Sequence, residues 1–429
     1  MKRHPIRRGT LVLAALLFAL AACDKAPAPA APYVPTGIHH APSANTVSMT
    51  PTRDGVIAPP DMVVSDDGTS QTPLVEKTVK VGLLLPLTGR SAALGKTMQD
   101  AATVALFDKY ARLSTAQQRI RVELLPKDSG DTAQQARTAM QEALDEGAEL
   151  IIGPVFGPAT EAAAPLATAK GVPVISFTNN NALAKPGVYA YGFLPQEQAQ
   201  RVVSYAIKAG KGRIAALVPD SPSGEIVLKA ARDTLASQGM ALVAEAKYPA
   251  QGVGIEQALS ALIPPGTPPN FDALLLPEGG PALATILRSL RTRGVTARDV
   301  QLIGTGFWDN PNLLRSVSLD GAWLASTPPQ ATALFEQRFL ATYKYAPTRT
   351  ASLAYDAVAL AVTLATSNRP FDTPALTQSS GYSGPANGIF RLRGDGTVQR
   401  GLAVLQVQGT NLMVVDPAPA GFTTTAVTQ

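Results

Sequence analysis

Residues 79–89 read VKVGLLLPLTG, and this stretch decides the fold. Its first seven residues are almost all apolar, which is typical of a strand buried on both faces of a parallel sheet. Pro86 and Gly89 then mark a loop. A helical pattern follows to about residue 113, with Leu94, Met98 and Leu106 on one face. The pattern predicts a strand–loop–helix unit, the repeating element of α/β folds.

The same unit recurs along the chain and predicts a parallel, doubly wound sheet. Further strands are expected at 120–126, 148–153 and 172–177, with helices at 132–146 and 159–170 between them. After a crossing segment at 189–194, the alternation restarts with strands at 213–218, 241–248, 271–276 and 300–304, and helices at 197–209, 225–238, 255–262 and 282–293. One core rarely grows past about 250–300 residues, so two such runs predict two α/β lobes.

The C-terminal part of the pattern differs from the rest. A second crossing is expected near 321–326, followed by helices at 331–343 and 351–366. Segments 388–392, 402–408 and 412–415 then alternate around the turns RGDGT and QGTN, which predicts antiparallel strands. We interpret RGDG as part of a hairpin turn, because its glycines suit a tight connection better than an adhesion motif.

The N-terminus carries the pattern of a removed targeting segment. Four basic residues precede an apolar run at 11–22, which is too short for a membrane span of about 20 residues. The sequence LAAC at 20–23 resembles the bacterial lipobox, which implies cleavage before Cys23 and lipid attachment to it. An ordinary secretory signal with a chance cysteine is the alternative. The lipid reading implies a membrane anchor, since each buried CH₂ of an acyl chain contributes about 0.8 kcal/mol.

Residues 23–77 are rich in Pro and Ala and predict a disordered tether, because such a segment buries too little apolar surface to order itself. His39 and His40 lie here and are expected to be solvated. Four of the 37 basic residues belong to residues 1–22, so the remaining chain has 33 basic and 32 acidic residues. This near balance predicts no binding to nucleic acid.

The rest of the chain has neither His nor Cys, since the three histidines are at positions 4, 39 and 40 and the single cysteine is Cys23. This excludes His-dependent triads, cysteine nucleophiles and the usual zinc ligand sets from the folded part. Neither a P-loop nor a Gly-x-Ser-x-Gly elbow occurs. We therefore expect a non-enzymatic binding protein with no catalytic residue, no metal site and no cofactor.

Seven stretches taken together resemble the periplasmic leucine/isoleucine/valine-binding-protein family. They are VGLLLPLTG (81–89), VELLPKDSGD (122–131), LIIGPVFGPAT (150–160), GVPVISFT (171–178), RIAALVPDSPSG (213–224), ASLAYDAVALA (351–361) and GIFRLRGDGTVQRGLAVLQV (388–407). The resemblance implies the type I periplasmic-binding fold: two Rossmann-like lobes with parallel sheets, three hinge crossings and an interlobe cleft. Hinge closure around a ligand is the behaviour expected of it.

The expected domain organisation follows from the resemblance and from the composition. Residues 1–22 are a lipoprotein signal peptide, 23–77 a tether, 78–417 the binding-like domain and 418–429 a tail. The first lobe is expected at 78–192 and 324–386, and the second at 193–323 and 387–417. The protein is expected in the periplasm, lipid-anchored to the outer or inner membrane. Asp24 leaves the choice of membrane open.

The resemblance allows two main functions, and a sensor subunit that binds a cell-wall fragment or a small polar ligand is a weaker third option. The preferred one is a lipoprotein that activates a bifunctional peptidoglycan synthase, as penicillin-binding protein activators do. The alternative is the receptor of an ABC transporter for branched-chain or other amino acids, with a permease and a small amino-acid ligand as partners. The long tether favours the first. So does the departure from the family's amino-acid grip: a serine is missing after Gly153-Pro154, and the first crossing has no arginine.

Candidate cleft residues follow the strands. They are Thr88, Ser91, Phe156, Thr178, Asn180, Glu278 and Phe307. Glu278 is placed where the family often meets the ligand's amine, and helix N-termini in the first lobe offer N–H groups to a carboxylate.

Overall fold

The computed structural model describes residues 55–59, 63–64, 70–71, 75–249, 252–296, 299–369 and 371–422. Within them the chain forms two α/β lobes, each built on a mainly parallel sheet. Cys23, the predicted signal peptide and His39 and His40 lie outside the described residues.

The first lobe is built on a five-stranded parallel sheet in the order β4-β3-β5-β6-β7. Its strands are β3 (Lys77–Leu85), β4 (Ile120–Asp128), β5 (Leu150–Ile152), β6 (Val174–Ser176) and β7 (Val188–Ala190). Its helices are α1 (Ala92–Tyr110), α2 (Thr115–Gln118), α3 (Ala133–Asp145), α4 (Gly157–Ala169), α10 (Pro329–Tyr343), α11 (Ala351–Thr366) and α12 (Thr373–Leu376).

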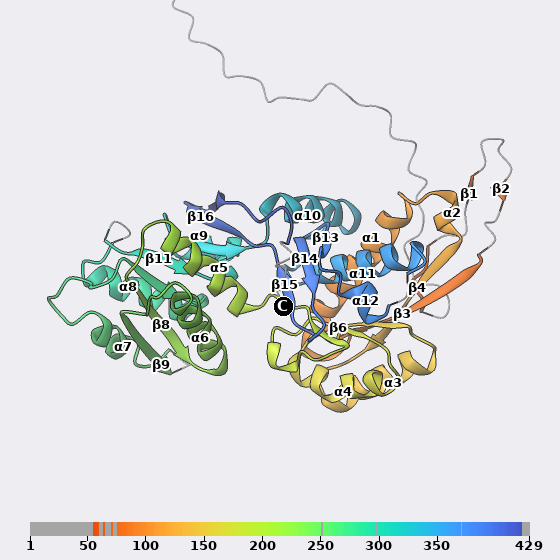
Figure 1. Ribbon diagram of the computed structural model, residues 1–429, viewed down its shortest axis with the longest axis horizontal. Coiled ribbons are helices and arrows are strands. Elements are labelled where there is room, and N and C mark those ends of the chain that lie inside the picture. The colour runs from red at the N-terminus through yellow and green to blue at the C-terminus, as the bar shows by residue number, and fades with distance from the viewer. Residues whose placement is uncertain are drawn as a thin grey trace, which may run out of the picture. The chain divides into compact units, whose positions relative to one another are not determined.

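Helices cover both faces of this sheet, as the apolar β3 sequence predicts. Leu83 and Leu85 belong to the core shared with α1 and α11, whereas Leu84 belongs to the core formed with α3 and α4. Figure 1 shows α3 and α4 on the side of the strands away from α1 and α11. Successive side chains of a strand point to opposite faces, so a continuous apolar run fills two cores at once.

The second lobe is built on a seven-stranded sheet in the order β17-β16-β12-β11-β10-β8-β9. Its strands are β8 (Ile214–Asp220), β9 (Ala244–Pro249), β10 (Ala273–Leu276), β11 (Gln301–Gly304), β12 (Trp323–Ser326), β16 (Ala403–Gln408) and β17 (Asn411–Asp416). Its helices are α5 (Pro195–Lys208), α6 (Pro222–Ala236), α7 (Ile255–Leu262), α8 (Gly280–Thr292) and α9 (Pro311–Ser316). Only the pairings of β16 are antiparallel.

A third sheet packs against the first lobe. Its strands are β13 (Tyr382–Gly384), β14 (Gly388–Leu392) and β15 (Val398–Arg400), paired antiparallel. Residues 388–400 were predicted in the second lobe, but Phe390, Leu392 and Val398 belong to the first lobe's core. The predicted RGDG turn joins β14 and β15, and its Gly396 accepts a hydrogen bond at 3.1 Å from the backbone N–H of Ala190. This contact holds the hairpin against the end of β7.

Three short crossings connect the lobes within the described residues. Residues 191–194 lead from β7 to α5, residues 327–328 from β12 to α10, and residues 401–402 from β15 to β16. The second crossing was predicted at 321–326. Most of that segment instead forms β12, because its backbone pairs with β11 and β16 in the second sheet.

Part of the segment predicted as a disordered tether is ordered by the first sheet. Ile57 is 4% exposed, and its N–H and C=O exchange hydrogen bonds of 3.0 and 2.9 Å with Leu124. Leu124 lies in β4, the edge strand, whose outer backbone groups are open to such pairing. A two-residue pair, β1 (Val63–Val64) with β2 (Ser70–Gln71), lies farther along this segment.

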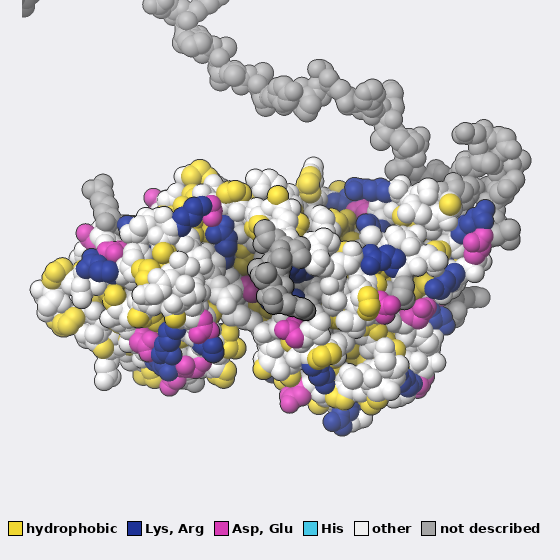
Figure 2. All heavy atoms as spheres, in the orientation of Figure 1, with side chains coloured by type: hydrophobic (Ala, Val, Ile, Leu, Met, Phe, Trp, Pro, Cys, Tyr) yellow, Lys and Arg dark blue, Asp and Glu magenta, His cyan; other side chains and the backbone are white. Residues whose placement is uncertain are grey.

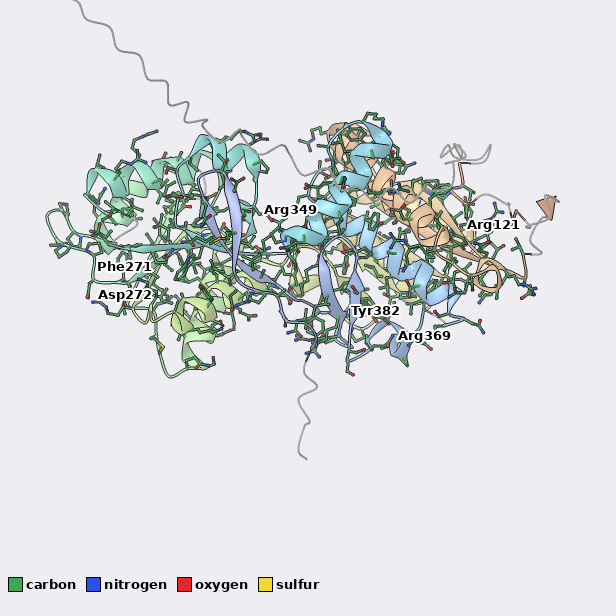
Figure 3. The ribbon with its side chains drawn as sticks, turned by 90° about the horizontal axis from the view of Figure 1, so that it is seen from above. Arg121, Phe271, Asp272, Arg349, Arg369 and Tyr382 are labelled. Atoms are coloured by element: carbon green, nitrogen blue, oxygen red, sulfur yellow. The ribbon has the colours of Figure 1, made fainter. Side chains whose placement is uncertain are left out.

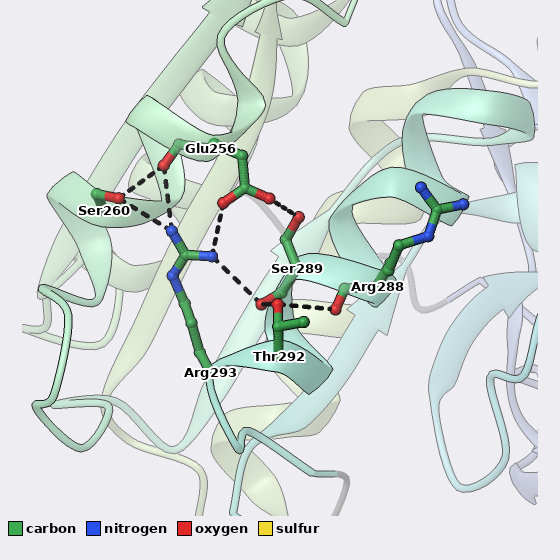
Figure 4. A network of polar contacts seen from close by, with 6 residues as sticks. All are labelled: Glu256, Ser260, Arg288, Ser289, Thr292 and Arg293. Carbon is green, nitrogen blue, oxygen red and sulfur yellow. Dashed lines mark hydrogen bonds and ion pairs between the residues drawn. The ribbon is translucent and has the colours of Figure 1, made fainter.

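Charged side chains on the second lobe form ion pairs that connect its helices and strands. Figure 4 shows Glu256 of α7 accepting from Arg293, which follows α8, with 2.7 Å between Oε2 and Nη1. Ser289 donates to the other carboxylate oxygen of Glu256, and Arg293 also donates to Ser260. Figure 2 shows basic and acidic side chains interspersed on the visible face. These groups satisfy one another and indicate a structural role.

Replacing Gly95 by alanine tests how tightly α1 packs on the loop after β3. A Cβ atom at position 95 would lie 2.0 Å from the carbonyl oxygen of Pro86. We expect Gly95→Ala to lower the free energy of unfolding by about 1–3 kcal/mol, because overpacking outweighs the better helix propensity of alanine. Urea unfolding measures this. Gly394→Ala, where no atom lies within 4 Å of the new Cβ, is the control. A stabilised Gly95→Ala protein would contradict the packing described.

Candidate functional site

The predicted site residues of the first lobe follow three neighbouring strands of its parallel sheet. Thr88 and Ser91 follow β3, Phe156 follows β5, and Thr178 and Asn180 follow β6. The carboxyl ends of parallel strands share one edge of a sheet, and ligands of open α/β folds bind along that edge. The topology therefore places these five residues on loops of one edge.

The loop after β3 is held by carboxylates of the protein itself. Asp128, the last residue of β4, accepts hydrogen bonds from the N–H of Leu87 at 2.8 Å and from the Thr88 hydroxyl at 2.5 Å. It also accepts from the N–H groups of Thr88 and Gly130. Burial opposes the charge of Asp128, but these four donors hold its pKa below the usual value.

A second aspartate completes the same loop. The N–H of Arg90 donates to Asp131 at 2.7 Å, at the short 3₁₀ turn η1 (Gly89–Ser91) that precedes α1. Asp128 and Asp131 together accept hydrogen bonds from backbone N–H groups of this loop, which are therefore not available to bind a ligand's carboxylate. The hydroxyl of Thr88 is also engaged, so Ser91 is the hydroxyl of this loop that makes no hydrogen bond within the described residues.

The loops after β5 and β6 meet. Thr178 is 2% exposed, and its hydroxyl accepts from the N–H of Asn180 at 3.1 Å. A Cβ atom at Gly157 would lie 3.6 Å from that hydroxyl and 3.9 Å from the Cβ of Asn180. Asn180 caps the turn η2 (Asn181–Leu183) by accepting from the N–H of Ala182, which leaves its amide NH₂ to donate. Phe156 precedes Gly157 and is 38% exposed.

In the second lobe the structure brings Glu278 and Phe307 close to each other. Glu278 follows β10; its carboxylate accepts from the Tyr248 hydroxyl at 2.7 Å and from the N–H of Gly279 at 2.9 Å. Burial, followed by the hydrogen bond to Glu278, raises the pKa of Tyr248. Phe307 is 52% exposed, and its Cβ lies 3.7 Å from where a Cβ of Gly279 would be.

Sequence reasoning missed a cluster at the crossings. Phe193, in the first crossing, lies close to two guanidinium groups, with 4.4 Å from its ring centroid to the Cζ of Arg349 and 5.4 Å to that of Arg400. The sequence analysis noted that the first crossing has no arginine. The arginines instead come from the start of α11 and the end of β15, far along the chain. No local pattern connects them with Phe193.

Arg349 joins the start of α11 to the second lobe. Its Nη1 donates to the carbonyl oxygen of Gly306 at 2.6 Å, and its Nη2 donates to the hydroxyl of Ser326 at 2.7 Å. Ser326 in turn donates to Asp309 at 2.5 Å, and Asp309 lies 3.6 Å from Nη2 of Arg349. Figure 3 shows Arg349 where the chain passes between the two lobes.

Arg400 is buried with an incomplete set of partners. It is 6% exposed, stacks 4.2 Å over the ring of Tyr191 and donates from Nη2 to the carbonyl oxygen of Tyr191 at 2.5 Å. Its Nε and Nη1 have no hydrogen-bond partner among the described residues.

Two carboxyl groups near Arg400 have raised pKa values. Burial raises the pKa of Asp356 to about 6, although hydrogen bonds from Ala386 and Asn387 and the charge of Arg400 act in the opposite direction. Burial likewise raises the pKa of the half-buried Glu197 to about 8, against the charge of Arg400. Desolvation of the carboxylates therefore outweighs their attraction to the arginine.

Metal chemistry and membrane insertion can be checked on the described residues. Within them, no three His, Cys, Asp or Glu side chains gather where they could bind a metal ion. Across the same ranges, every helix is too short or too polar to span a bilayer.

A protein-family model matches most of the chain. The model of the periplasmic binding protein family matches residues 78–411. The chain belongs to this family. An uncharacterized protein of Rickettsia prowazekii (strain Madrid E) is 23% identical over 184 residues, which are 43% of this chain and 47% of the relative. The match thus spans about half the length of that curated relative.

Solved structures share the fold of this periplasmic binding protein. A branched chain amino acid ABC transporter periplasmic ligand-binding protein from Burkholderia xenovorans LB400 matches with a TM-score of 0.64 and 18% identity, over 79% of this chain and 95% of the other. A solute binding protein of an ABC transporter from Rhodopseudomonas palustris BisB5, in complex with 3,4-dihydroxy benzoic acid, matches with a TM-score of 0.57 and 21% identity, over 80% and 96%. These likenesses confirm the type I fold.

Glu197→Gln tests the protonated carboxyl near Arg400. The pKa of Glu197 is 4.5 in the unfolded chain and about 8 in the folded protein. Between these two pH values the folded protein keeps a proton that the unfolded chain releases. Its contribution to stability therefore falls as pH rises from about 4.5 to about 8 and is constant above. We expect Glu197→Gln to exceed the wild-type free energy of unfolding at pH 8 by about 1–3 kcal/mol and to match it near pH 4.5.

The control for this pH dependence is Glu225→Gln, which removes a carboxylate paired with Lys247 at the surface. It should not gain stability at pH 8. A constant difference between Glu197→Gln and wild type from pH 4.5 to 8 would contradict the raised pKa.

Proposed function

We propose that this protein is the substrate-binding receptor of an ABC transporter and acts without catalysis. The observation that carries the proposal is family membership over residues 78–411, together with solved relatives described as ABC transporter binding proteins. The comparisons favour this alternative over the synthase activator that the sequence analysis preferred. The partners are then a small solute and a permease. The proposed location is the periplasm, and Cys23 is the proposed site of lipid attachment after removal of the signal peptide.

The free groups of the candidate site suggest which residues contact the solute. Phe156 and Phe307 are exposed aromatic side chains on strand-end loops of the first and second lobes. Ser91 and the amide NH₂ of Asn180 supply polar groups that are free to bind. Thr88 and Glu278 are already hydrogen-bonded within the protein. We therefore assign the solute contacts to two aromatic faces and a few polar groups, the usual composition of a small-molecule site.

The proposal predicts a rise in melting temperature with a small panel of solutes. The panel contains leucine, isoleucine, valine and 3,4-dihydroxybenzoate, which the two solved structures described above suggest. A ligand at 100 times its dissociation constant should stabilise the protein by about 2.7 kcal/mol. Differential scanning fluorimetry followed by calorimetric titration measures this. The absence of a shift with every member of the panel would contradict the receptor function.

Phe307→Ala tests the assigned contact. We expect it to weaken binding of the solute that shifts the melting temperature by about tenfold or more, because removal of a ring loses contact area. The ligand-free melting temperature should change little, since Phe307 is half-exposed. Leu334→Ala, which removes a 67%-exposed apolar side chain on α10, is the matched control and should bind as wild type does. Equal affinity of the two variants would remove Phe307 from the site.

A further inference from the structure

The turn that carries Phe307 is built with little freedom. It comprises Thr305 and the short helix η3 (Gly306–Trp308) after β11. Trp308 is fully buried, and its indole N–H donates to the carbonyl oxygen of Glu278 at 2.7 Å. A Cβ atom at Gly304 would lie 2.5 Å from the Trp308 ring, so the ring packs directly on the end of β11. Phe307 is the side chain of η3 that remains exposed.

Both backbone polar groups of Gly306 are hydrogen-bonded to side chains. Its N–H donates at 2.9 Å to Gln198, which lies in α5 of the second lobe. Its carbonyl oxygen accepts at 2.6 Å from Arg349. A Cβ atom at Gly306 would lie 2.8 Å from Nη1 of Arg349 and 3.0 Å from Nε2 of Gln198. These two side chains therefore leave no space for a side chain at position 306, and they fix the peptide groups of the turn by hydrogen bonds.

Arg349 is anchored in the first lobe although it holds a turn of the second. Its carbonyl oxygen accepts from the N–H and hydroxyl of Ser352, which is 1% exposed in α11. The Ser352 hydroxyl also lies 3.0 Å from Oδ1 of Asn387, in the turn between β13 and β14 of the third sheet. The guanidinium of Arg349 thus extends from a fixed backbone in one lobe to the ligand-facing turn of the other.

We propose that Arg349 is a positioning residue for ligand binding: it fixes the turn at residues 305–309, and thereby presents Phe307 and the neighbouring Glu278 loop. The ligand part of this inference rests on the proposed receptor function, whereas the effect on the turn does not. Any separation of the lobes at the crossings that lengthens the Arg349–Gly306 contact also frees the turn. The second lobe's part of the site is therefore completed by the first lobe.

The fluorescence of the buried Trp308 can report how often the turn opens to solvent. The chain has two tryptophans, and the other is Trp323 in β12. In a Trp323→Phe background, Trp308 is the single tryptophan, and excitation selective for tryptophan avoids the ten tyrosines. Acrylamide quenching then reports how often the turn opens to solvent. We expect weak quenching in this parent and about threefold stronger quenching in Arg349→Met, because loss of one clamp increases local opening. Arg349→Lys should lie between them.

The control is Arg338→Met, which removes an arginine that pairs with Asp108 at 2.7 Å inside the first lobe. It should quench as the parent does. Gly306→Ala should also break the contact between Arg349 and the turn, because the new Cβ would lie too close to the guanidinium group, so its quenching should equal that of Arg349→Met. This second variant decides the test if Arg349→Met folds poorly. Quenching in Arg349→Met and Gly306→Ala that equals Arg338→Met would overturn the proposal.

Calorimetric titration with the panel solute that stabilises the protein tests the binding consequence. We expect Arg349→Met to weaken its affinity by about tenfold and Arg338→Met to leave it unchanged. A loosened turn with unchanged affinity would overturn the positioning role. If no panel solute binds the wild type, the receptor function fails while the quenching experiment still decides whether Arg349 holds the turn.

Discussion

The contact of two arginine side chains with one phenylalanine ring joins the crossings between the two lobes. Phe193 belongs to the first crossing, Arg349 contacts the residue that ends β12 before the second, and Arg400 ends β15 just before the third. A cation over an aromatic face contributes about 0.5–2 kcal/mol, more where water is excluded. Because each partner belongs to a different part of the chain, this stack joins three connections that the backbone leaves separate.

The cluster also explains why charged groups lie inside the crossings. Burial of a charge is costly unless it is paired or hydrogen-bonded. Arg349 meets this condition with Gly306, Ser326 and Asp309, whereas Arg400 relies on Tyr191 and aromatic faces. Neighbouring carboxyl groups take up protons more readily than usual for the same reason. The crossings are therefore a polar region between well-packed cores, with hydrogen-bond donors of Arg400 that have no partner among the described residues.

Most of the fold could be predicted from the sequence because its elements depend on local patterns. The run at 79–85 predicted β3, and the helix expected at 351–366 coincides with α11. The assignment of 388–400 to the second lobe failed to anticipate the third sheet, since a strand's sequence does not state which sheet it joins. The order near Ile57 was missed because it depends on the free edge of β4.

The candidate site could be predicted only in part. Strand ends identify the loops, so the loop positions of Phe156, Thr178 and Phe307 could be predicted, whereas their contact with a solute stays a proposal. The hydrogen-bond partners of the polar candidates Thr88 and Glu278 could not be predicted from their positions. Asp128 accepts a hydrogen bond from Thr88, and Glu278 accepts one from Tyr248. In both pairs the partners are 30 or more residues apart in the sequence. Arg349 had no signal in the sequence, since its partners at 193, 306 and 326 follow no spacing rule.

A double-mutant cycle between Phe193 and Arg349 tests the central claim most directly. The free energies of unfolding of Phe193→Leu, Arg349→Met and the double variant are measured by urea denaturation, with Phe193→Leu and Arg338→Met as the control pair. We predict a coupling of about 1 kcal/mol between Phe193 and Arg349 and additivity in the control pair. Additivity within about 0.3 kcal/mol for both pairs would contradict the claim that this stack joins the crossings.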